Sequence, residues 1–152
     1  MEDVSKMRKL YTTTRCKNCL NSFRLEKIEM SMLAAFCNQL IRFFEELESS
    51  YPEEKSISMG LEAIKAAKRS NPRLILDMFH EYLYKPANDL IMTRNDEEII
   101  RLARSIMSTR FNELMPALMI FDKYWPSMSQ TNREVIWQYL EVLCKLCEKA
   151  RA

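Results

Sequence analysis

The sequence predicts an all-α protein, a single compact domain of about six helices with irregular, orthogonal or bundle-like packing. Apolar residues recur at spacings of three and four along most of the 152 residues, which is the period of an amphipathic helix. No segment shows the strict alternation of apolar and polar residues that indicates a half-buried strand. The composition, 47% hydrophobic and 29% charged, is that of an ordinary globular chain, and this length suffices for one hydrophobic core.

The first long apolar stripe begins at Ile28 and continues to Leu47. Its spacing predicts one long helix with a single buried face. Tyr51-Pro52 is expected to end this helix, because proline lacks the amide proton that the next helical bond needs. Before the stripe, residues 1–20 form a basic N-terminal arm or a first helix, within one domain that spans residues 1–152. The apolar positions of the stripe are Ile28, Met32, Leu33, Phe36, Leu40, Phe43, Phe44 and Leu47.

A second helix is expected from about Ser56 to Arg69, with cations in its last turn, where they suit the helix dipole. A third helix opens at Asn71-Pro72, because asparagine is a good N-cap and proline fits the first helical position. Pro86 is expected to close it. The positions expected inside are Ile57, Leu61 and Ile64 in the second helix, and Ile75, Met78, Phe79, Tyr82 and Leu83 in the third.

The fourth helix begins after Asn95, a candidate cap followed by three acidic residues in the favourable first turn. A fifth helix spans about residues 112–124, with Pro116 in its first turn or at a kink, and Trp125-Pro126 terminates it. The core face of the fourth helix is expected to consist of Ile99, Leu102, Ala103 and Ile106.

The last helix follows a predicted capping box at residues 127–130. In this motif Ser127 accepts a hydrogen bond from the amide three residues on, while Gln130 reaches back to the start. The apolar stripe that follows is Ile136, Leu140, Leu143 and Cys147, with Trp137 and Cys144 beside it.

Four groups of residues stand in a characteristic order: Phe43-Phe44-Glu45-Glu46-Leu47 ending at Tyr51-Pro52, Asn71-Pro72-Arg73 before Phe79, Pro86 before Asp96-Glu97-Glu98, and Trp125 before Ile136-Trp137-Gln138-Tyr139-Leu140. Over about residues 30–147 this order resembles a set of short, uncharacterised all-helical proteins of nucleocytoplasmic large DNA viruses. The chain departs from that pattern at Ile99-Ile100, where aromatic residues usually follow the acidic pair. The resemblance implies a viral protein of the host cytoplasm or the virion, and it transfers no active site.

The formal net charge of +2 conceals an uneven distribution of charge. Residues 1–27 carry seven Lys or Arg residues against three acidic ones. Such a segment can attract nucleic acid by releasing counterions from phosphates, although the same charges also suit a solvated first helix. The candidate nucleic-acid-binding residues are Lys6, Arg8, Lys9, Arg15 and Lys17.

Five cysteines and no export signal predict free thiols in a reducing compartment, and therefore a cytoplasmic protein. Two C-x-x-C pairs, Cys16 with Cys19 and Cys144 with Cys147, offer four thiolates for a tetrahedral zinc ion. The alternative is core packing, because Cys147 falls on the apolar stripe of the last helix. Apart from this zinc ion, no cofactor is expected.

The sequence favours a protein that is not an enzyme. Gly60 is the only glycine, and phosphate-binding loops and nucleophile elbows depend on glycine. His80 is the only histidine; Asp77 shares its helix face, an arrangement more typical of a surface hydrogen bond than of a catalytic dyad.

Eleven methionines are unusual for this length, and several stand close to aromatic residues near position 120. Flexible, polarizable side chains of this kind fill irregular cores and also form adaptable binding surfaces. The functional interpretation is a helical protein-interaction or assembly module that binds a protein partner or a second copy of itself. No apolar run approaches the length of a membrane span. The candidate interaction residues are Met115, Met119, Phe121, Tyr124 and Trp125.

Overall fold

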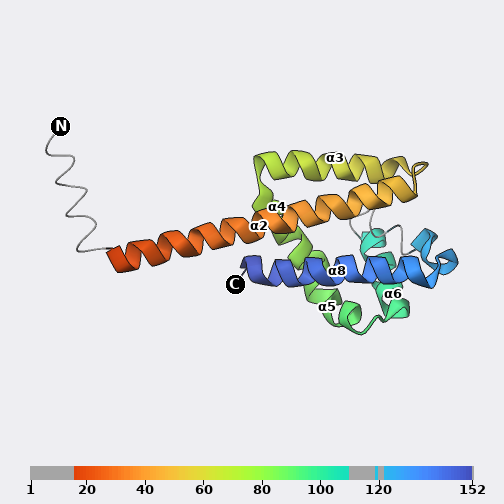
Figure 1. The fold of residues 1–152 in the computed structure, drawn as a ribbon. Coiled ribbons are helices and arrows are strands. Elements are labelled where there is room, and N and C mark those ends of the chain that lie inside the picture. Colours follow the sequence, from red (N-terminus) through yellow and green to blue (C-terminus); the bar gives the residue numbers. More distant parts are fainter. Residues whose placement is uncertain (1–15, 110–118, 120–121, 152) are drawn as a thin grey trace, which may run out of the picture.

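The computed structural model describes residues 16–109, 119 and 122–151, and every regular element in them is helical (Figure 1). This confirms the predicted all-α class. Most of the expected fifth helix, residues 112–124, lies outside the described residues. The elements are α2 (Cys16–Ser50), α3 (Lys55–Ser70), α4 (Pro72–Phe79), the π-helix η1 (His80–Tyr84), α5 (Lys85–Met92), α6 (Asp96–Thr109), the 3₁₀-helix η2 (Trp125–Ser127) and α8 (Gln130–Arg151).

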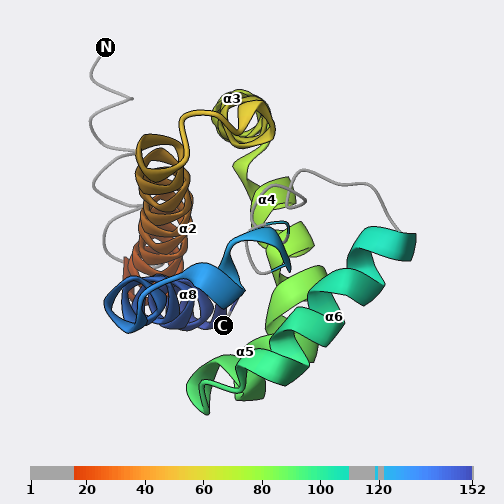
Figure 2. The same cartoon turned by 90° about the vertical axis from the view of Figure 1, so that its right-hand side faces the viewer.

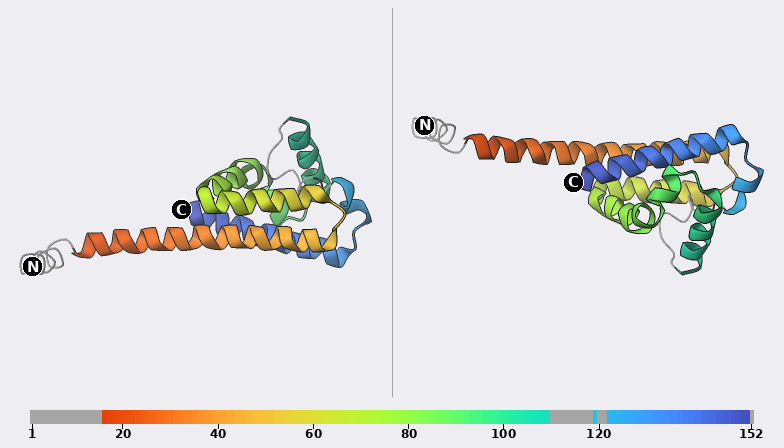
Figure 3. Two further views of the ribbon diagram at one scale, coloured as in Figure 1. Left: turned by 90° about the horizontal axis from the view of Figure 1, so that it is seen from above. Right: turned by 90° about the horizontal axis from the view of Figure 1, so that it is seen from below.

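The longest element is α2, whose 35 residues extend about 50 Å at the usual helical rise. It ends before Tyr51-Pro52, as predicted, but it begins well before the apolar stripe, so residues 16–27 are part of the same helix. It packs on the rest of the molecule from Met32 onward, while the residues before Met32 project away from it (Figures 1 and 3).

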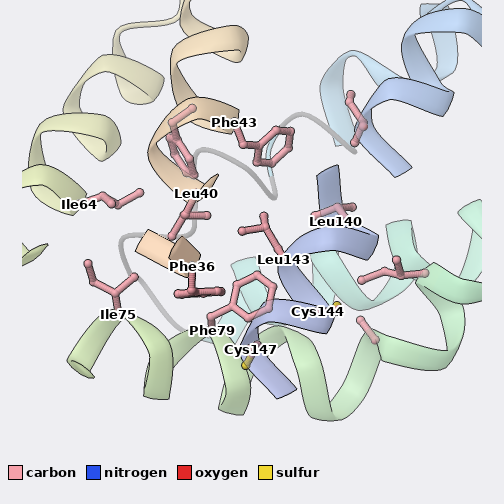
Figure 4. Close-up of a cluster of buried hydrophobic side chains, with 14 of the residues drawn as sticks. Phe36, Leu40, Phe43, Ile64, Ile75, Phe79, Leu140, Leu143, Cys144 and Cys147 are labelled. Carbon is pink, nitrogen blue, oxygen red and sulfur yellow. The ribbon is translucent and has the colours of Figure 1, made fainter. Parts of the chain in front are cut away.

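One hydrophobic core lies between α2, α3, α4 and α8 and extends to buried residues of α5, α6 and η2; Figure 4 shows part of it. Phe36 of α2 meets Phe79 of α4 edge to face, with ring centroids 5.0 Å apart. Burying a side chain of this size contributes about 1.5–3 kcal/mol. The stripes expected for the second and last helices are buried as predicted: Ile57, Leu61, Ile64, Ile136, Leu140, Leu143 and Cys147.

The expected helix end at Pro86 is wrong, because the chain remains helical from α4 through η1 into α5. The π-helix η1 lies immediately before the proline, and the N–H of Lys85 bonds to the carbonyl of His80, five residues back. A proline ring crowds the carbonyl four residues before it, and the wider π turn relieves this crowding. Pro86 itself occupies the first turn of α5, where its missing N–H is tolerated.

Of the three predicted helix N-caps, one forms its side-chain hydrogen bond as predicted. The side-chain oxygen of Asn95 accepts the N–H of Glu98 at 3.3 Å, which confirms this cap. Asn71 holds the N-cap position of α4 before Pro72 but makes no side-chain cap bond. At α8 the capping residue is Ser129 and not Ser127, since Ser129 accepts the N–H of Asn132 at 3.2 Å.

Seen along the molecule in Figure 2, α2 and α8 lie on one side, and α3, α4, α5 and α6 on the other. The two helices α2 and α8 run antiparallel to each other and make the most extensive contact between elements (Figure 3). Among the described helices, none has the length and hydropathy needed to cross a lipid bilayer.

Candidate protein-interaction surface

The projecting part of α2, residues 16–31, is called the α2 arm below. It exposes four large apolar side chains within eight residues: Phe23 is 75% exposed, Leu25 61%, Ile28 50% and Met30 71%. The prediction that Ile28 belongs to the buried stripe is therefore wrong. Scattered apolar side chains are normal on protein surfaces, but four within eight residues make this segment a candidate interaction surface.

The sequence explains why the α2 arm leaves the core. Seven residues correspond to about two helical turns, so positions seven apart share a face. Going back by seven from Phe43 and Phe36, both buried, leads to Glu29. Two such steps back from Leu40, the first to Leu33, lead to Glu26. Two positions of the buried face of α2 are thus acidic in the arm, and packing them on a core would desolvate two carboxylates.

Apolar residues lie on two sides of the α2 arm, and one of these sides continues the buried face, since Leu25 lies five full turns before Phe43. Leu25, Ile28 and Met32 are spaced by three and four and form one stripe. Phe23 and Met30 are seven apart and lie on the opposite side. The arm therefore presents apolar side chains in two directions, and the Leu25 stripe borders the side of α2 that faces α8 farther along the helix.

A second apolar stripe follows the flank of α8. Val135, Tyr139, Val142 and Leu146 are spaced by four, three and four, beside the buried face of this helix. Val135 and Val142 are 44% and 41% exposed, and the ring of Tyr139 stacks on Phe43 of α2 at 5.2 Å. This stripe and the adjoining side of α2 are called the α2–α8 face. None of the other described helices covers it (Figure 2).

The α2–α8 face ends in an open cleft of about 210 Å³, between the end of α2 and the start of α8. Its walls combine apolar and polar side chains, which suits an amphipathic segment better than a purely apolar ligand. The lining residues are Phe43, Glu46, Leu47, Ser50, Tyr51, Met128, Asn132, Val135, Ile136 and Tyr139.

Acidic residues surround this cleft end of α2. Residues 45–55 contain five glutamates and one lysine. Glu45 lies 3.8 Å from Lys65, and Glu54 pairs with Lys123. Glu46 and Glu53 have no cation partner among the described residues. The C-terminal end of α2 and the turn after it therefore carry a net negative charge.

The predicted interaction residues near position 120 are only partly described. Met115 and Phe121 lie outside the described residues, and Met119 is partly buried. Tyr124 stacks on Tyr51 at 4.2 Å and donates a hydrogen bond to Glu54, which raises the pKa of the phenol together with burial. The prediction that Trp125 forms part of an exposed surface is wrong.

Trp125 is only 2% exposed and belongs to the core. Its ring meets Trp137 edge to face at 5.2 Å, and the guanidinium of Arg133 lies over it at 5.3 Å. The indole N–H donates to Asp96 at 3.3 Å. These contacts join η2, α6 and α8, so the tryptophan is a packing residue and cannot form part of an exposed surface.

The structure does not assemble the four cysteines proposed for zinc. Cys144 and Cys147 point into the core beside Phe79 (Figure 4), at the level of Phe36. Cys16 lies twenty residues before Phe36, which is about 30 Å along the same helix. Burial raises the pKa of the Cys144 thiol to about 12 and that of Cys147 to about 11, which opposes thiolate formation. The second pair, Cys144 and Cys147, packs in the core, as the alternative interpretation predicts.

The predicted basic residues fall almost entirely outside the described residues. This holds for Lys6, Arg8, Lys9 and Arg15, while Lys17 is in the first turn of α2. In the part of the arm whose side chains are described, Arg24 and Lys27 are balanced by two glutamates. The described arm therefore adds no excess of positive charge.

His80 lies in the π-helix, where its ring stacks on Tyr84 at 5.1 Å. Its predicted neighbour Asp77 accepts a hydrogen bond from Arg151 at 2.5 Å instead. The pKa of His80 is lowered, first by partial burial and then by the positive charges of Arg151 and Lys85. The Asp77–Arg151 ion pair links α4 to the end of α8.

Comparison with known proteins gives no match to a family model, to a curated protein or to a solved structure. The candidate surface therefore depends on geometry alone. Sequence reasoning missed the α2 arm, although the acidic residues Glu26 and Glu29 on the face of Phe36 were a readable signal for it.

Proposed function

We propose that this protein is a helical interaction or assembly module, not an enzyme, which binds another protein or itself through the α2 arm and the α2–α8 face. The observation that carries the proposal is the projecting arm with four exposed apolar side chains. Fully burying each of them against a partner gains about 1.5–3 kcal/mol. Through the resemblance to viral helical proteins, the proposal includes the host cytoplasm or the virion as the place of action.

A helix that extends beyond the core can be explained in two ways: it only completes the fold, or it binds a partner. A helical segment that projects about 25 Å beyond the core gains no stability from packing on that core. An isolated helix of this length is only marginally stable in water. A segment that binds a partner gains stability from that contact. The apolar side chains of the α2 arm are suited to such a contact, because they are concentrated where the protein's own core no longer reaches.

A photoreactive phenylalanine analogue at position 25 tests this function in cells that produce the protein. We expect cross-links to protein at position 25 and few at position 62, an exposed site on α3 that serves as the matched control. The double variant Leu25→Ser and Ile28→Ser should abolish a partner contact without unfolding the chain, because both side chains are exposed. Equal cross-linking from positions 25 and 62 would contradict the proposal.

Nucleic-acid binding by the basic N-terminal segment is the competing function and makes a different prediction. Phosphate-led binding weakens steeply as salt rises, whereas apolar docking changes little. A gel-shift series at two salt concentrations separates them. Retention of nucleic acid at low salt, lost at high salt and lost when Lys6, Arg8, Lys9, Arg15 and Lys17 are changed to Ser, would favour this alternative.

A further inference from the structure

The described charges of α2 are sorted by the side of the helix on which they lie. Arg24 and Arg42 are five full turns apart and therefore point in the same direction. Lys27 lies about three turns before Asn38, which in turn is one turn before Arg42. These three cations thus share one side of α2, whereas the two glutamates of the arm occupy positions of its buried face.

The turn between α3 and α4 is basic and lies beside the middle of α2 (Figures 1 and 3). Residues 63–76 contain four Lys or Arg residues and no Asp or Glu. The ammonium group of Lys68 donates a hydrogen bond to the side-chain oxygen of Asn38 at 2.5 Å. The thiol of Cys37 lies 3.8 Å from the carbonyl oxygen of Pro72. Because Asn38 is on the side of α2 that carries its cations, the fold joins two basic segments into one surface.

This surface is called the basic face below, and most of its charges have no partner among the described residues. Lys65 does not belong to it, because Glu45 and Glu62 lie 3.8 and 3.9 Å from its ammonium group. Lys68 bonds to the neutral amide of Asn38. The other cations are exposed and form no ion pair or hydrogen bond with a described residue, so they are free to pair with an external anion. The cations of the basic face are Arg24, Lys27, Arg42, Lys68, Arg69 and Arg73.

We infer that the basic face binds the phosphate backbone of a double-stranded nucleic acid. Arginine supplies four of the six cations, and its planar guanidinium group can pair with two phosphate oxygens at once. From Arg24 to Arg42 the face extends about 27 Å along a straight helix, which approaches one turn of B-DNA, about 34 Å. The inference goes beyond the proposed function, because it assigns a second surface and a second class of partner.

The side chains between the cations favour a nucleic-acid duplex over other polyanions. From Lys27 to Arg42 this side of α2 carries only small or polar residues, which allow a rigid phosphate backbone to approach closely. A helix that binds an anionic membrane needs large apolar side chains that enter the lipid. A single strand needs aromatic side chains on which its bases stack. The residues between these two cations on the basic face are Ser31, Ala34, Ala35 and Asn38.

Fluorescence anisotropy with a DNA duplex of about 30 base pairs, three helical turns, provides the first test. With six phosphate contacts, the logarithm of the binding constant should fall against the logarithm of salt concentration with a slope of about −5 or steeper. The triple variant Arg42→Gln, Arg69→Gln and Arg73→Gln should reduce this slope by about 3. It should also raise the Kd by about tenfold or more at low salt. All three side chains are exposed, so the fold should persist, which circular dichroism checks.

A second triple variant serves as the matched control for net charge. Lys55→Gln, Arg101→Gln and Lys149→Gln remove the same number of positive charges from exposed positions outside the basic face. This variant should keep the slope of the unchanged chain. Equal losses in the two triple variants would overturn the inference, because they would show that only the total charge matters.

Lysine acetylation locates the contact directly. With the duplex bound, Lys27 and Lys68 should be acetylated several times more slowly than in the free protein, while Lys55 and Lys149 should react at the same rate in both. Mass spectrometry of the modified peptides measures these rates. Protection of the control lysines without protection of Lys27 and Lys68 would place the nucleic acid elsewhere and overturn the inference.

The remaining outcomes separate this inference from the other functions. Absence of duplex binding at low salt would overturn it, as would binding only to vesicles of phosphatidylserine and phosphatidylcholine. If the first triple variant binds like the unchanged chain but binding is lost when the predicted basic residues before and at the start of α2 are changed to Ser, the competing function is correct. Cross-linking from position 25 to a protein tests the proposed function independently of all these results.

Discussion

The two halves of α2 belong to one continuous helix and differ in what surrounds them. In the packed half, Phe36 and Phe44 are fully buried against neighbouring helices, while in the arm Phe23 is three-quarters exposed. Helical propensity does not distinguish the two segments, since both are helical. The difference lies in what covers the helix: neighbouring helices cover the core-facing positions after Leu33, whereas in the arm that face is uncovered and is interrupted by Glu29 and Glu26. One face of a helix can thus both build a core and mark where the core stops.

The largest effect expected from this comparison is a difference in stability between two matched substitutions. Phe36→Ala should lower the free energy of unfolding by about 3–5 kcal/mol, because it removes a buried ring and leaves a cavity. Phe23→Ala should change it by less than about 0.5 kcal/mol, because the ring is exposed in the arm. Urea denaturation of both variants measures the two values. Similar losses in the two variants would show that the arm packs on its own core.

The helical fold and most of the core stripes were predictable from the sequence, because a period of 3.6 residues is visible in any amphipathic helix. The α2 arm was missed because periodicity reports which side of a helix is apolar and not what covers it. Ile28 was assigned to the buried stripe on spacing alone, yet half of its side chain is exposed.

Two other differences arise from contacts between residues far apart in the sequence. Trp125 stands next to methionines and aromatics in the chain, which suggested a surface, but Trp137 and Arg133 enclose it in the structure. The helix through Pro86 depends on a π turn, and no residue pattern in the sequence indicates that turn. Local composition therefore predicted elements well and exposure poorly.

Thiol reactivity provides the next largest contrast between core and arm. Because burial raises the pKa values of Cys144 and Cys147 to about 12 and about 11, these thiols should resist iodoacetamide at pH 8 until the protein unfolds. A cysteine placed in the arm by Leu25→Cys should react at once. Mass spectrometry of alkylated peptides, in native buffer and in urea, measures both. Fast native labelling of Cys144 would contradict the burial.

These thiols also predict a pH dependence of stability. In the unfolded chain a thiol ionises near its ordinary pKa of 9.0, whereas Cys144 in the fold stays protonated. The unfolded state therefore releases protons first, and stability should fall as pH rises above about 9. Replacing Cys144 by Ala should flatten this decline, which unfolding curves between pH 8 and 10 would show.

A smaller effect is expected at Glu141, on the helix that packs against the buried half of α2. Its carboxylate accepts hydrogen bonds from Lys145 at 2.8 Å and from Arg94 at 3.0 Å, and these bonds lower its pKa from the ordinary value of 4.5. The contribution of these bonds to stability is complete above that value and is lost as pH falls through the lower pKa of the folded state. Thermal melting at pH 7 and pH 3 should therefore show a smaller decline in Glu141→Gln. An unchanged decline would show that these bonds do not stabilise the fold.

The smallest effect is expected where the core face of α2 turns acidic. Glu29→Leu restores an apolar residue at the position seven before Phe36, so the sequence pattern alone predicts a stabilised core. The structure predicts otherwise, because α8 ends at Arg151, near the start of the packed half, and leaves nothing for the new side chain to contact. In the Leu25→Ser and Ile28→Ser background, which removes the proposed partner contact of the arm, the change in unfolding free energy should stay within about 0.5 kcal/mol. A gain above about 1 kcal/mol, the scale of a buried methylene or more, would show that the body reaches the arm, and the division of α2 into two halves would then be wrong.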